Sequence, residues 1–287
     1  MSVVAAAALV AEEARRTAAH PAGPERTAML RRKVAVATWR PPTEGRLMTR
    51  IVVDAEPALS YVAARRAEGA RGLTLMHVVG AAAARAVLTV PQLNTRVRAG
   101  RVVGFEDVSV GFAVDIGRGA DLAPVKVPGA TDLTPAQIAT RVWEGVDALR
   151  DGTDPGFRRS TRVAKWTPRL LMKPMLLAGS VVLGGWGLPL MGQQGNPLGS
   201  VFISNVAPLG IEEAFLAPVP FARTPVYLSL GATSERPVVR DGVVVAVRQF
   251  TMCLTADHRL VDGAQCALFL DALQRCLADP ARLDRPA

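Results

Sequence analysis

The chain is poor in cysteine, in aromatic residues and in lysine. Its three cysteines, Cys253, Cys266 and Cys276, are too few and too irregularly spaced for a disulfide framework or a zinc site. We therefore expect a protein of the reducing cytoplasm that holds no metal. Aromatic residues make up 5% of the chain, which leaves too few for base-stacking platforms, and no nucleic-acid motif is present. Nucleic acid is accordingly not an expected partner.

Acidic residues are outnumbered by basic ones. The net charge is +9, yet only four of the 34 basic residues are lysines. An arginine-rich, alanine-rich chain of this kind fits a coding bias as well as an anion-binding face. A ligand with several phosphates would suffice as the anionic partner. Hydrophobic residues make up 49% of the chain, so a sizeable core is available.

The N-terminal stretch is apolar but has no basic leader, so we interpret residues 3–19 as a helix and not as a secretory signal. A Pro- and Gly-rich break follows at residues 20–24. The predicted organisation is a helix and linker over residues 1–24 and one domain over residues 25–287.

The chain is organised around residues 257–263, Asp-His-Arg-Leu-Val-Asp-Gly. Upstream, residues 250–255 alternate as a half-buried strand, and downstream apolar residues recur at helical spacing over 264–277. His258 is thus predicted at a strand-to-helix junction, where a side chain is held rigidly and can reach a cleft. Asp262 is well placed to cap the helix that follows. A lone His and Asp pair is also a common structural contact.

This stretch resembles known acyltransferase motifs. His-x-x-x-Asp-Gly is similar to the active-site motif of the chloramphenicol acetyltransferase-like enzymes, and the longer Asp-His-Arg-x-x-Asp-Gly-Ala resembles the catalytic domain of the dihydrolipoamide acyltransferases of 2-oxoacid dehydrogenase complexes. Three further segments resemble the same family: Pro-Gln-Leu-Asn at 91–94, Val-Gly-Phe-Ala-Val-Asp at 110–115 and Phe-Ile-Ser-Asn-Val at 202–206. The resemblance implies an α/β fold, an α+β two-layer sandwich with a mixed sheet flanked by helices.

The resemblance also implies a mechanism and a set of site residues. His258 would be the general base that activates a thiol, because an imidazole titrates closer to neutral pH than a thiol does. Ser204 would donate a hydrogen bond to the oxyanion, although a serine there also suits the simple capping of a strand end. Asp262 would hold His258 and its loop in place, paired with Arg31 or Arg32, between which the sequence does not choose.

The same family implies substrates and partners. Coenzyme A and dihydrolipoamide, or another thiol acceptor, would exchange the acyl group, in a homotrimer whose active sites lie between subunits. The family's lipoyl domain has no counterpart here, so we expect the lipoyl group on another chain. The family's Pro-His before the first strand is replaced by Gly45-Arg46-Leu47, which alters expected contacts on the substrate side.

Residues 150–199 depart from the family pattern and are predicted to be an insertion. A basic stretch runs into residues 175–191, which carry no charge and contain several glycines. Three interpretations stay open for this segment: a buried or subunit-contact element, a membrane-surface element over 165–191, or a span, for which it is short. A non-catalytic assembly or membrane-associated scaffold is therefore the alternative to an enzyme.

Overall fold

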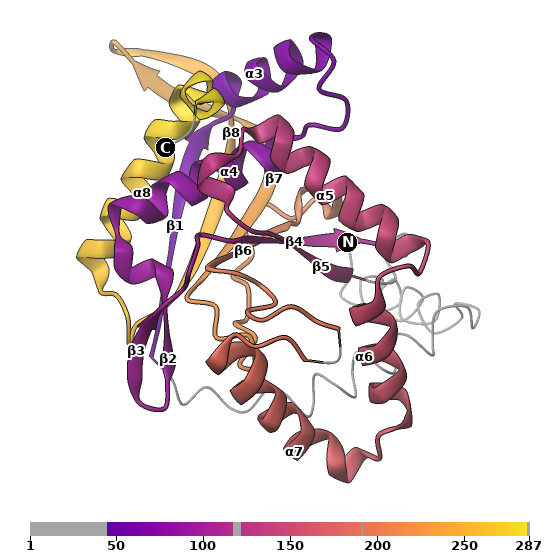
Figure 1. The fold of residues 1–287 in the computed structure, drawn as a ribbon. Coiled ribbons are helices and arrows are strands. Elements are labelled where there is room, and N and C mark those ends of the chain that lie inside the picture. Colours follow the sequence, from indigo (N-terminus) through magenta and orange to yellow (C-terminus); the bar gives the residue numbers. More distant parts are fainter. Residues whose placement is uncertain (1–44, 117–121, 191, 286–287) are drawn as a thin grey trace, which may run out of the picture.

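A computed structural model describes residues 45–116, 122–190 and 192–285 of the chain, and Figure 1 shows how their elements are arranged. The predicted helix and linker over residues 1–24 lie outside these described residues, as do Arg31 and Arg32. What the sequence predicts for these residues therefore remains a prediction.

A mixed six-stranded sheet forms the centre of the molecule, with the strand order β1-β8-β7-β6-β4-β5. Strand β6 runs parallel to both of its neighbours, β4 and β7, whereas the other pairs are antiparallel. A separate hairpin is formed by β2 and β3. The strands are β1 (Arg46–Asp54), β2 (Thr95–Arg98), β3 (Arg101–Gly104), β4 (Val110–Asp115), β5 (Leu122–Val127), β6 (Val201–Asn205), β7 (Val226–Arg240) and β8 (Val243–Asp257).

Helices cover one face of this sheet, which confirms the predicted α/β two-layer class. Apolar residues of β8, β7, β6 and β4 that point to this face share one core with α4, α5 and α8. The long helices are α3 (Glu56–Ala67), α4 (Leu75–Thr89), α5 (Pro135–Arg150), α6 (Pro155–Trp166), α7 (Arg169–Gly179) and α8 (Gly263–Ala278). Shorter helical turns are η1 (Pro91–Asn94), η2 (Ala130–Asp132), η3 (Ser180–Trp186), η4 (Ala207–Leu209) and η5 (Pro280–Asp284).

The other face of the sheet is covered by irregular chain. Residues 195–199 and 206–222 lie across it, and a Cβ atom at Gly111 or Gly231 would collide with their backbone carbonyls. These two glycines let the chain approach the strands closely. The prediction that residues 250–255 are half-buried is wrong, because both faces of β8 are covered there: Thr251, Cys253 and Thr255 are buried like their neighbours.

One buried histidine belongs to the fold and not to the site. His77 lies in the first turn of α4, 1% exposed, and its Nδ1 accepts a hydrogen bond from the backbone N–H of Thr74 at 3.0 Å. An Nδ1 that accepts carries no proton, so the ring is neutral. Burial, together with the nearby charge of Arg66, lowers the pKa of His77 from 6.5 to about 4.

This histidine predicts a pH-dependent stability. Below pH 6.5 His77 becomes protonated in the unfolded chain, whereas in the folded chain it stays neutral down to about pH 4. The free energy of unfolding therefore falls as the pH falls from 6.5 to about 4. The loss amounts to about 3 kcal/mol. His77→Gln keeps a side-chain acceptor for the Thr74 N–H and cannot charge. Its denaturant-unfolding free energy should therefore depend less on pH between 6.5 and 4, and parallel curves for the two proteins would contradict this.

The predicted insertion is folded and is attached to the sheet region. Helices α6 and α7 extend away from the sheet, as Figure 1 shows, and the π-helical turn η3 follows α7 directly. Arg96 donates a hydrogen bond to Asn196, Lys126 Nζ donates to the Gly195 carbonyl at 2.7 Å, and the Arg98 guanidinium lies 4.7 Å from the ring centre of Trp186. In the described ranges, no helix is both long and apolar enough to cross a membrane.

Candidate active site

His258 lies in a tight turn that closes the end of β8. The Asp257 carbonyl accepts a hydrogen bond from the Leu260 N–H at 3.0 Å, which makes His258 and Arg259 the two central residues of the turn. The Asp257 carboxylate also binds the Arg259 backbone N–H and guanidinium, at 2.6–3.1 Å. The backbone on both sides of the imidazole is thus fixed, while the His258 side chain itself is exposed.

Gly45 supports the same turn from the start of β1. The His258 N–H donates to the Gly45 carbonyl at 3.1 Å, and a Cβ at Gly45 would lie 3.5 Å from the His258 Cβ. The sequence motif did not assign a role to Gly45 or to the Asp257 and Arg259 pair. For the pair, the signal was the i, i+2 spacing of opposite charges around a histidine at a strand end.

Asp262 caps α8, as predicted. Its carboxylate accepts hydrogen bonds from the N–H groups of Ala264 at 2.9 Å and Gln265 at 3.4 Å, and Gln265 Oε1 accepts in return from the Asp262 N–H at 3.0 Å. This reciprocal capping box fixes the point at which the turn becomes a helix. The hydrogen bonds of Asp262 found in the described chain go to α8 and not to the imidazole, so the structure shows Asp262 as the cap of α8.

Ser204 lies on β6, the strand that is parallel to both of its neighbours. It is half-buried and points to the sheet face away from the helices, the face that Phe202 and Tyr227 also occupy. Within the described residues the Ser204 hydroxyl has no hydrogen-bond partner, whereas that of Ser229, level with it on β7, donates to the Ala214 carbonyl. The Ser204 hydroxyl can therefore donate a hydrogen bond to a ligand, whereas the Ser229 hydroxyl already donates to the Ala214 carbonyl.

A single copy of the chain does not bring Ser204 and His258 together. Ser204 is level with Ser229 and Cys253 in the sheet, and His258 lies five residues beyond Cys253, two strands away from β6. With about 4.8 Å between strands and about 3.3 Å per residue, their Cα atoms are on the order of 20 Å apart. A thioester carbonyl cannot contact both groups across that distance.

The other candidate groups have structural explanations. Cys253 and Cys266 are buried, and burial raises the pKa of the Cys266 thiol to about 11, which makes it a poor nucleophile. Tyr227, beside Phe202, is buried as well, and its pKa is raised by desolvation. Across the part of the chain that the structure describes, no three His, Cys, Asp or Glu side chains are grouped as a metal site would require.

The fold defines a class of protein. A structure of chloramphenicol acetyltransferase matches this chain with a TM-score of 0.52 at 13% identity, over 86% of this chain and 94% of that one. The Azotobacter vinelandii dihydrolipoamide acetyltransferase matches with a TM-score of 0.63 at 18% identity, over 90% and 89%. The cubic core of the pyruvate dehydrogenase multienzyme complex gives 0.62 at 17%, over 90% and 89%. The fold is chloramphenicol acetyltransferase-like, as the motifs predicted.

Within that class, the chain belongs to the family described as 2-oxoacid dehydrogenases acyltransferase (catalytic domain), whose model matches residues 47–154 and 195–284. The predicted family and the predicted dihydrolipoamide acyltransferase-like class of enzyme are thereby confirmed. A Bacillus subtilis relative, the dihydrolipoyllysine-residue acetyltransferase component of an acetoin cleaving system, is 27% identical over 212 residues, 74% of this chain. The chain spans 43% of the length of that relative.

Proposed function

We propose that the chain transfers an acyl group between two thiols, coenzyme A on one side and dihydrolipoamide or another acceptor on the other. One observation carries this proposal: His258 sits in a turn fixed by Gly45 and Asp257 in a chain that belongs to the acyltransferase family. The study of the A. vinelandii enzyme names a serine, a histidine and an asparagine, the last two four positions apart. His258 and Asp262 have the same spacing.

The steps follow from the groups present. His258 takes the proton of the acceptor thiol, and the resulting thiolate attacks the thioester carbonyl carbon, so that a new C–S bond forms and the carbonyl electrons move onto oxygen. Ser204 donates a hydrogen bond to that oxyanion. When the intermediate collapses, the original C–S bond breaks and the departing thiolate takes the proton back from His258. Asp262 is a positioning residue, since it holds the end of the turn.

We infer that each active site forms between two copies of the chain. His258 of one copy and Ser204 of the next would meet on one thioester, which accounts for two groups that lie on the order of 20 Å apart within one copy. The expected assembly is a homotrimer, with trimers joining into a larger core. We expect the chain to work in the cytoplasm and to exchange the acyl group with a lipoyl group that a partner protein presents.

The assay that tests the proposal uses the purified chain, dihydrolipoamide, and acetyl-, succinyl- and branched-chain acyl-coenzyme A in turn. Free coenzyme A and the acylated lipoamide are separated and quantified. We expect stoichiometric formation of both products with at least one donor, dependent on the acceptor. If no donor or thiol acceptor gave turnover, although the chain bound vesicles or a partner complex, a non-catalytic scaffold would be the better account.

A further inference from the structure

The insertion has a one-sided charge. The part that the family match leaves out, residues 155–194, contains six basic residues and no acidic one; the basic residues are Arg158, Arg159, Arg162, Lys165, Arg169 and Lys173. All six lie on α6 and α7. The family match breaks between residues 154 and 195, so these helices are an addition to the catalytic framework. An isolated cluster of cations on an added element calls for an anionic partner.

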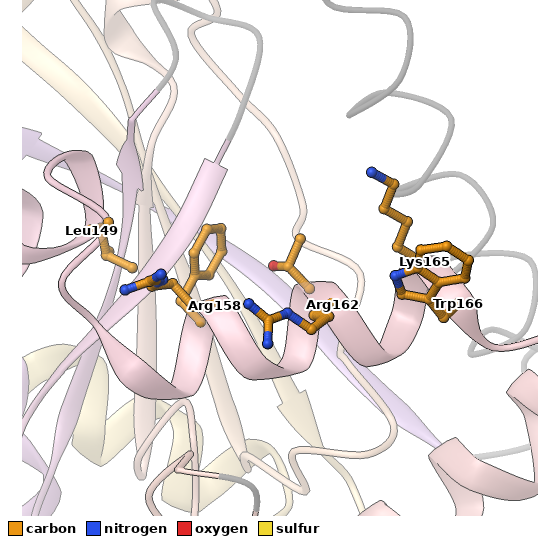
Figure 2. A pocket seen from close by; sticks show the side chains of 8 residues that line it. Leu149, Arg158, Arg162, Lys165 and Trp166 are labelled. Carbon is orange, nitrogen blue, oxygen red and sulfur yellow. The ribbon is translucent and has the colours of Figure 1, made fainter.

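Three of these cations line a shallow groove along α6. The groove has a volume of about 390 Å³, and Arg158, Arg162 and Lys165 lie on it together with Thr161, Phe157 and Trp166. Figure 2 shows the two guanidiniums side by side along α6 and Lys165 beside Trp166. Spacings of three and four residues place the cations on one helix face. Such a groove offers several donors to a phosphate group beside an apolar wall.

Apolar side chains continue from this groove into solvent. Trp166, at the end of α6, is 80% exposed, and Leu170, in the first turn of α7, is 88% exposed. Leu177, seven positions after Leu170, is exposed on the same side of α7, whereas Met172 on the opposite side is buried. Val181, in the turn η3 that follows α7, is exposed as well. A helix that turns leucine and valine outward beside a row of cations has the composition of an interfacial membrane element.

We propose that α6 and α7 dock the protein onto a membrane surface that bears anionic lipids. Lipid phosphates would occupy the α6 groove, while Trp166 and Leu170 enter the boundary between headgroups and acyl chains. A two-fold contact between copies through this face is the poorer account, because it would bring six cations against six. An acidic soluble polypeptide would satisfy the charges but not the apolar stripe. This docking goes beyond acyl transfer and does not depend on it.

The test is co-sedimentation of the full chain with vesicles of phosphatidylcholine alone and of phosphatidylcholine with phosphatidylglycerol. We expect binding only to the anionic vesicles, weakened by salt. One variant carries Arg158→Gln, Arg162→Gln and Lys165→Gln. Each cation near an anionic surface contributes about a five-fold factor in partitioning, so this variant should bind about 100-fold more weakly. A matched control carries Arg71→Gln, Arg101→Gln and Arg141→Gln, three exposed arginines outside the insertion, and should bind within a few-fold of the unmodified chain.

A second variant distinguishes the entry of apolar side chains into the membrane from attraction by charge alone. Trp166→Ser with Leu170→Ser keeps every cation and should still lose at least ten-fold in vesicle binding, while binding to soluble polyglutamate stays unchanged. Circular dichroism confirms that each variant is folded. Three results would each overturn the proposal. The first is equal binding to neutral and anionic vesicles, and the second is a loss of vesicle binding in the control triple variant as large as in the α6 triple variant. The third is binding to polyglutamate as tight as binding to vesicles, together with vesicle binding that the serine substitutions leave unchanged.

Discussion

His258→Ala should lower the rate of acyl transfer by a factor of about 10² to 10⁴, which is the usual contribution of a positioned general base. Without the imidazole, the acceptor thiol must lose its proton to water. Stability should hardly change, because the His258 side chain is exposed and its backbone N–H still donates to Gly45. The measurements are the steady-state rate in the coenzyme A and dihydrolipoamide assay and the free energy of unfolding.

The matched control for this change is Arg275→Ala, which removes an exposed side chain from α8 and with it one surface ion pair to Asp271. Surface pairs of this kind contribute little, so rate and stability should both stay close to those of the unmodified chain. A His258→Ala protein that transferred acyl groups at an unaltered rate would remove the general base from the mechanism.

Ser204→Ala should lower kcat by a factor of about 10² to 10³, because a fixed donor to an oxyanion contributes about 3 kcal/mol in the transition state. The Michaelis constant for the thioester should change little, since the oxyanion exists only after attack. The Ser204 hydroxyl has no partner in the described part of the chain, so its loss leaves no buried group unsatisfied.

Ser229→Ala is the informative control for Ser204. The two serines are level with each other on neighbouring strands, and the Ser229 hydroxyl donates to the Ala214 carbonyl. Its removal should cost about 1 kcal/mol of stability and leave kcat unchanged. Equal losses of kcat in the two variants would show that Ser204 acts through the packing of the sheet and not through an oxyanion.

The local chemistry around the motif could be predicted from the sequence. Asp262 followed by an amphipathic pattern predicts an N-cap, and the carboxylate does accept from the first turn of α8. Asp241-Gly242 predicts a two-residue hairpin, and both residues have positive φ between β7 and β8. Both predictions depend on neighbours in sequence, which is why they could be made without the fold.

The covering of β8 could not be predicted. Its alternation of larger and smaller residues is typical of a strand with one wet face, yet Thr251 and Thr255 are buried. The segment that covers them has no helical or strand periodicity and so gives no signal of its own. Irregular chain of this kind packs through close approach of its backbone at glycines such as Gly231, and such an approach leaves no periodic pattern in the sequence.

Register was likewise outside the reach of the sequence. The motifs identify Ser204 and His258 as candidate site residues, but they do not indicate how far apart the two residues lie in the sheet. The pairings of β6 with β7 and of β7 with β8 place them at different levels of the sheet. The insertion itself was predicted, but its first helix was not, although Asp154-Pro155 is a helix-start signal. Helix α6 begins there, and the Asp154 carboxylate accepts a hydrogen bond from the Phe157 N–H.

Mixing the two inactive variants tests the account most directly. His258→Ala and Ser204→Ala chains are co-expressed in equal amounts, purified as one assembly and assayed for acyl transfer. If each site takes its histidine from one copy and its serine from the next, about one quarter of the sites in a random mixture regain both groups, and activity should return to roughly a quarter of the unmodified level. Activity no higher than that of either variant alone, in an assembly shown to contain both chains, would contradict a site shared between copies.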